Sequence, residues 1–160
     1  MIRLSITLFL IFNIMRHTIA EVKISYHPKR LKGAVKITSS EYATKVIREN
    51  WNQGTLNLYE EFKILLMNNS NEVLGLAPLS RGGMTGTLVD MRILFATVIK
   101  SGATSIITVH NHPSGKLKPS QADINIYNKI KDAAKLLDIN YLDNLIITEE
   151  GKYSFIDEGY

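Results

Sequence analysis

The sequence predicts an α/β fold, a three-layer α/β/α sandwich built on a mixed, mostly antiparallel sheet. Segments with the periodicity of strands alternate along the chain with amphipathic segments that have the periodicity of helices. Two of the strand segments are separated by only a short polar turn, which favours antiparallel pairing, and helices in such a pattern must cover the faces of the sheet. The 160 residues, 45% of them hydrophobic, suffice for one buried core but hardly for two.

The first half of the chain predicts a helix, a hairpin and a second helix. The first helix is expected to begin at Ser39-Ser40-Glu41 and to end at residues 52–54. Its apolar side carries Tyr42, Ala43, Val46, Ile47 and Trp51. Residues 62–67 and 72–79 are expected to form two antiparallel strands, because the Asn and Ser residues between them tolerate turn geometry. The next helix runs from Asp90 as N-cap to Gly102, which can adopt the positive φ of a helix end.

The second half predicts a buried strand, a helix and two further strands. Residues 104–109 are apolar or β-branched, which is typical of a buried strand. A helix is expected to open at Pro119-Ser120 and to continue through Leu137. Residues 141–148 and 153–156 then predict two strands joined by a turn at residues 149–151. Near the N-terminus, residues 21–26 alternate like a short half-buried strand, and residues 28–33 form a basic linker.

Two histidines at the end of the predicted strand 104–109 are candidate metal ligands. His110 and His112 are two residues apart, so their imidazoles lie on one face of the strand while Asn111 points away. Asp123, at the start of the following helix, is the candidate third ligand. Zinc with three protein ligands keeps its fourth position for water, which is typical of a catalytic site, and the chain has no cysteine to close it.

The same residues allow a purely structural interpretation. Ser120-x-x-Asp123 also fits a capping box, in which the two side chains satisfy backbone N–H groups at the start of a helix. A single histidine at a strand end is more often packed or hydrogen-bonded than a ligand. The chain has only four histidines, however, and two of them share this strand face, which favours metal binding.

These residues resemble a known motif. His-x-His, ten intervening residues and then Asp, with Ser three before the Asp, is similar to the JAMM motif of JAB/MPN-domain metalloproteases, and His-Asn-His-Pro-Ser-Gly resembles the RadC family. The resemblance extends from about Ile37 to the C-terminus and includes Gly-Gly-Met-Thr-Gly-Thr at residues 82–87 and Leu142-Asp143. It departs from the family at Asn144, where many relatives have histidine, and no helix-hairpin-helix motif precedes the domain.

The resemblance implies a domain organisation and a fold. A hydrophobic segment and basic linker at residues 1–36 precede a RadC-like JAB/MPN domain at residues 37–160. The sandwich predicted from the pattern of strands and helices is then expected to have the cytidine-deaminase-like arrangement of JAB domains.

The resemblance also implies roles for two further residues. JAMM enzymes use a glutamate from an upstream strand as proton shuttle, and the candidates are Glu60 and Glu61. Phe62, Ile64 and Leu66 predict that even positions are buried, so Glu60 is expected on the inward face and Glu61 in solvent beside Lys63. The hydroxyl of Ser120 is expected to donate to the oxygen of an attacked carbonyl. The resulting hypothesis is a zinc-dependent peptidase or isopeptidase that acts on a peptide or protein substrate.

The alternative is a DNA-repair-associated accessory or DNA-binding protein without protease activity. It is suggested by the history of the RadC name and by a formal net charge of +4 with a pI near 9.2. Much of the excess charge comes from Lys23, Lys29, Arg30, Lys32 and Lys36. We interpret these residues as a solvated segment, since no recognition helix is visible, and expect any nucleic-acid binding to be weak. A third hypothesis is a nuclease or deaminase that uses the same metal site, but zinc deaminases of the base-editing type need cysteine ligands, which this chain lacks.

The first twenty residues leave the location of the protein open. Arg3 precedes a run of mostly Leu, Ile and Phe at residues 4–15 that resembles the apolar core of a signal peptide, and Thr18-Ile19-Ala20 is a fair cleavage site. The run is too short to span a bilayer comfortably. Because relatives of this type are intracellular, we expect a cytoplasmic protein without a stable membrane span. A secreted or membrane-associated protein is the alternative, and the sequence does not indicate an oligomeric state.

Overall fold

The structure is a computed structural model that describes residues 33, 35–82 and 88–160. The expected strand at residues 21–26, most of the basic linker, the N-terminal hydrophobic run and most of the glycine-rich motif at residues 82–87 lie outside this part of the chain. No helix in the described ranges combines the length and apolar character needed to cross a membrane.

A five-stranded sheet in the order β2-β1-β3-β4-β5 forms the centre of the domain. The strands are β1 (Glu61–Met67), β2 (Val73–Arg81), β3 (Ser105–Asn111), β4 (Asn140–Ile147) and β5 (Lys152–Ser154). Neighbouring strands are antiparallel except β3 and β4, which are parallel. A parallel pair needs a long crossover, and α4 (Gln121–Leu136) provides it. The predicted α/β fold with a mixed, mostly antiparallel sheet is confirmed.

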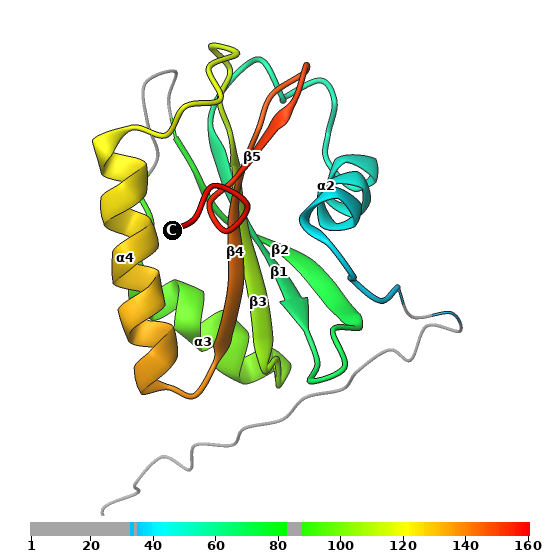
Figure 1. Cartoon of the computed structure of the whole chain (residues 1–160), viewed down its shortest axis with the longest axis vertical. Helices are drawn as coiled ribbons and strands as arrows, with labels where there is room; N and C mark the ends of the chain where they lie inside the picture. Colours follow the sequence, from blue (N-terminus) through cyan, green and yellow to red (C-terminus); the bar gives the residue numbers. More distant parts are fainter. Residues whose placement is uncertain (1–32, 34, 83–87) are drawn as a thin grey trace, which may run out of the picture.

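Helices cover both faces of this sheet (Figure 1). α2 (Ser40–Glu49) lies on one face, and α3 (Met91–Ser101) and α4 lie on the other. One buried cluster joins α2 to alternate strand residues such as Leu65 and Ile107. A second joins α3 and α4 to the intervening residues, among them Ile64 and Ile106. Successive side chains of β1 and β3 therefore enter different cores, and both strands are buried along their whole length.

The prediction that Glu61 and its neighbour Lys63 lie in solvent is wrong. Their exposed fractions are only 9% and 8%, because the face they share packs under α2 and the segment that follows it. The Glu61 carboxylate accepts a hydrogen bond of 2.8 Å from the Thr55 hydroxyl and lies 3.6 Å from the Lys63 ammonium group. That ammonium group in turn sits 3.7 Å above the ring of Trp51. The two opposite charges are therefore stabilised by each other and by their neighbours in the interior, and not by solvent.

The helix ends follow the local sequence signals, with one exception. Ser39 caps α2 by accepting a hydrogen bond from the Tyr42 amide, and Asp90 caps α3 in the same way with Arg92. Gly102 ends α3 with φ of 67°, as predicted. α2 already ends at Asn50, before the predicted residues 52–54, and Tyr42, expected on its apolar side, is 38% exposed.

Candidate metal centre

β3 brings its two histidines together at its C-terminal end. The Nε2 atoms of His110 and His112 are 3.0 Å apart. His112 follows the last residue of β3, yet its amide still donates to the Ile147 carbonyl of β4 at 3.0 Å, which extends the strand by one residue. The alternation of a strand therefore holds at this point, and both imidazoles lie on one face as predicted.

Asp123 reaches the histidines from the first turn of α4. Its Oδ1 atom is 3.1 Å from His110 Nε2, and its Oδ2 atom is 3.6 Å from His112 Nε2. One ligand atom from each of the three side chains falls within a common span of 4.8 Å. The side chains are 3%, 12% and 16% exposed, so the cluster is shielded from most of the solvent.

The capping box and the histidine cluster are compatible. The Ser120 hydroxyl accepts from the Asp123 amide at 3.2 Å, while Asp123 Oδ2 accepts from both the amide and the hydroxyl of Ser120 at 2.6 Å. The other carboxylate oxygen, Oδ1, is left for His110. The capping box is therefore present, it fixes the direction of the carboxylate, and it is compatible with a role of Asp123 as metal ligand.

Each imidazole is held by its surroundings. His112 Nδ1 lies 2.6 Å from the Lys116 carbonyl, which can only accept, so Nδ1 donates and Nε2 keeps a lone pair in the neutral ring. The ring of His110 stacks on Phe62 with 5.9 Å between ring centroids and 11° between ring planes. His110 Nδ1 is buried and has no protein hydrogen-bond partner within the described part of the chain. Its Nε2 faces the other two ligands.

The cluster fits a zinc ion. The lone pair of His112 Nε2 faces His110 Nε2 and the carboxylate of Asp123, and converging lone pairs repel one another unless a cation lies among them. Two imidazole nitrogens and one carboxylate oxygen are a donor set that zinc accepts while keeping a position open.

A proton can take the place of that cation. Burial opposes ionisation of Asp123, but hydrogen bonds from His110 and His112 outweigh it and hold the pKa of the carboxyl well below its usual range. Burial also disfavours the charged form of His112, yet the hydrogen bonds to Asp123 and the Lys116 carbonyl prevail and raise the pKa of the imidazole. Metal binding must therefore displace a proton from the cluster.

Glu60 lies at the same pocket as the three candidate ligands. The pocket has a volume of about 530 Å³, and Ser120 also lines it, together with Lys116, Lys118 and Lys129. The negative charge of Glu60 contributes to the raised pKa of His112, after the larger effect of Asp123. The structure thus brings all five predicted site residues to one pocket.

Sequence reasoning missed a buried amide behind this pocket. Asn111 was expected only to point away from the histidines, but its side chain is fully buried and makes three hydrogen bonds, two to the segment that precedes β1 and one to Glu61, the first residue of β1. The only feature of the sequence that singled out Asn111 was its position between two candidate ligands. Its hydrogen-bond partners are 50 or more residues away in the sequence, so no local pattern predicted these bonds.

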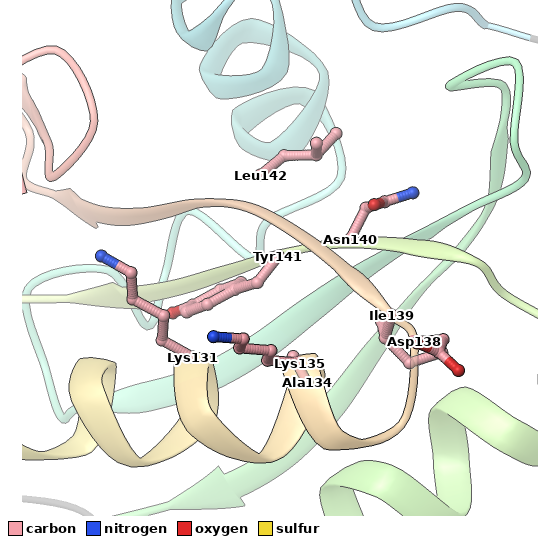
Figure 2. A pocket seen from close by; sticks show the side chains of 8 residues that line it. All are labelled: Lys131, Ala134, Lys135, Asp138, Ile139, Asn140, Tyr141 and Leu142. Atoms are coloured by element: carbon pink, nitrogen blue, oxygen red, sulfur yellow. The ribbon is translucent and has the colours of Figure 1, made fainter.

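A second pocket lies at the opposite end of β4 (Figure 2). It is formed by the C-terminal half of α4, including Lys131 and Lys135, and by the start of β4, including Tyr141. The hydroxyl of Tyr141 is already engaged by Thr108. The pocket contains none of the predicted site residues.

Comparisons with known proteins agree with the geometry. The sequence model of the RadC-like JAB domain matches residues 37–160. A UPF0758 protein of Flavobacterium johnsoniae is 52% identical over 124 residues, which cover 78% of this chain and 53% of that protein. One from Porphyromonas gingivalis is 42% identical over 101 residues, covering 62% and 44%, and one from Staphylococcus haemolyticus is 32% identical over 126 residues, covering 79% and 54%. The chain spans about half the length of these curated relatives.

Proposed function

The chain belongs to the RadC-like JAB domain family, and from that premise we propose that it is a zinc-dependent hydrolase of peptide or isopeptide bonds. The observation that carries the proposal is the convergence of His110, His112 and Asp123 in a pocket that also contains a carboxylate, Glu60. The JAB superfamily includes metallohydrolases, and a metal-dependent hydrolase combines a metal site with a group that carries protons.

In this proposal the three converging side chains hold the metal ion. When bound there, zinc supplies Lewis-acid activation of water and of a carbonyl group. His112 keeps its Nε2 available because the Lys116 carbonyl holds the proton on Nδ1. Asp123 is oriented through its second oxygen by Ser120, so the helix cap also preorganises the ligand set.

Glu60 and Ser120 act on the substrate. The carboxylate of Glu60 accepts a proton from the attacking water and delivers it to the leaving amine, which must be protonated before it departs. Ser120 donates its hydroxyl hydrogen to the carbonyl oxygen as negative charge develops there. That hydroxyl donates to Asp123 Oδ2 in this structure, so substrate binding requires it to change partner.

A metal-dependent activity screen tests the proposal. Purified protein is incubated with a set of peptides and ubiquitin-like conjugates, first as prepared, then after chelation, then after Zn²⁺ is restored. We expect cleavage that is lost with the chelator and recovered with zinc. Cleavage that persists without metal would contradict the proposed chemistry. The same preparation is titrated with duplex DNA, and tight binding at physiological salt would favour the DNA-associated alternative.

A further inference from the structure

We propose that Asn111 is a positioning residue that sets the carboxylate of Glu60 against the metal ligands. The inference rests on the proposed function and assigns a part in it to a side chain that does not enter the pocket. Asn111 lies between His110 and His112 but points to the opposite face of the sheet, where it is 0% exposed.

Three hydrogen bonds tie this amide to the segment that carries Glu60. The oxygen of Asn111 accepts from the Glu61 amide at 2.7 Å. Its nitrogen donates to the carbonyls of Leu56 at 2.6 Å and Tyr59 at 2.8 Å. One acceptor and two donors are thus all engaged, and only an amide side chain of this length offers that set.

The bonds flank Glu60 on both sides. The carbonyl before it, of Tyr59, and the amide after it, of Glu61, are both held by Asn111. The carbonyl of Glu60 itself accepts from the Gly82 amide at 2.9 Å. The backbone around Glu60 is therefore fixed directly by the strand that carries the two histidines.

The register of β1 and β3 shows where Glu60 lies relative to the histidines. In the antiparallel pair of β1 and β3, Phe62 is opposite His110, and the pairing ends there. Two further steps back along the chain from Phe62 correspond to two steps forward from His110, so Glu60 falls opposite His112. The β1–β3 ladder no longer holds Glu60 at this point, and the Asn111 side chain supplies the link to β3 there, while the Gly82 amide continues the link to the side of β2.

A double-mutant cycle separates positioning from a merely structural role. Asn111→Ala and Glu60→Gln are made singly and together, with Ile107→Ala as the matched control, since Ile107 is buried on the same face of β3 and lies opposite Leu65 in the ladder, several residues from Glu60. We expect Asn111→Ala to keep zinc and to lower kcat about 10- to 100-fold with KM nearly unchanged. In the Glu60→Gln background it should add less than about twofold, because the group it positions is gone. Asn111→Ser, which replaces the amide with a hydroxyl that can still donate and accept, is the milder variant if Asn111→Ala does not fold.

A second measurement does not depend on turnover. The ¹³C resonance of the Glu60 carboxyl is followed while Zn²⁺ alone is added to the wild type, Asn111→Ala or Asn111→Ser, and Ile107→Ala. We expect the zinc response of the wild type and of Ile107→Ala to agree and that of the Asn111 variant to be reduced.

The two measurements distinguish the possible failures. If the wild type cleaves no substrate, the proposed hydrolase function fails, while the carboxyl resonance still decides the role of Asn111. An equal zinc response in the wild type and the Asn111 variant, or a wild-type carboxyl that does not respond, overturns the inference. So does a fall in kcat that is fully multiplicative with Glu60→Gln.

Discussion

At the scale of single residues, the contact between His110 Nε2 and His112 Nε2 decides what the cluster can bind. The two atoms are 3.0 Å apart beside a carboxylate, so either a proton on one of the nitrogens or a metal ion among the three side chains can hold them together. We expect about one zinc ion per chain in purified protein and none in His110→Ala/His112→Ala, measured by elemental analysis. His17→Ala/His27→Ala removes the other two histidines and should keep the zinc. Full zinc retention in the first variant would show that the site is elsewhere.

Glu60 and Glu61 are neighbours with opposite expected effects. Glu60→Gln should keep zinc content and fold and lower kcat by about 100-fold or more, because a proton carrier is lost. Glu61→Gln should leave kcat nearly unchanged but lower the free energy of unfolding by about 1 to 3 kcal/mol, because the buried Lys63 loses its charged partner. Initial rates and urea unfolding are compared in both variants. The reverse order of rates at equal zinc content would contradict the assignment of Glu60.

At the scale of elements, the N-terminus of α4 combines a helix cap with a candidate metal ligand. Ser120→Ala should lower the free energy of unfolding by about 1 kcal/mol, and Ser39→Ala, which removes the equivalent cap of α2, should do the same. Only Ser120→Ala should also weaken zinc binding, by about tenfold, because Ser120 orients Asp123. Zinc titrations and thermal unfolding of both variants give the comparison. Equal zinc affinity in the two would mean that the cap does not position the carboxylate.

The elements also show what the sequence can predict. The caps of α2 and α3, the turn after β1 and the shared face of His110 and His112 are local properties, and they were predicted correctly. The burial of Glu61 was not, since it depends on α2 packing over a face whose sequence contains charged residues. The bonds of Asn111 could not be predicted either, because they join segments 50 or more residues apart that meet only in the folded sheet.

At the scale of the whole molecule, the proposed zinc ion and protons would compete for the same cluster, and both would affect the stability of the fold. In the metal-free protein the pKa of His112 is raised above its ordinary 6.5, so its contribution to stability is present below that value and is lost as pH rises through the raised pKa. The pKa of Asp123 is lowered from 3.8, so its contribution is present above that value and is lost only in acid. Between these limits the ion pair stabilises the metal-free fold. Zinc requires the neutral imidazole and binds only the folded chain, so its stabilising effect should grow as protons leave.

The expected result is a zinc-dependent increase in Tm that is larger at about pH 8 than at about pH 6, because fewer protons then compete for the imidazoles. Tm is measured by differential scanning calorimetry with chelator and with excess Zn²⁺ at both pH values. Asp123→Asn is the control: it removes the charge that both raises the pKa of His112 and binds the metal, so its zinc-dependent increase should be small at either pH. An increase in the wild type that is smaller at the higher pH would mean that zinc does not displace the proton of His112 and binds outside this cluster.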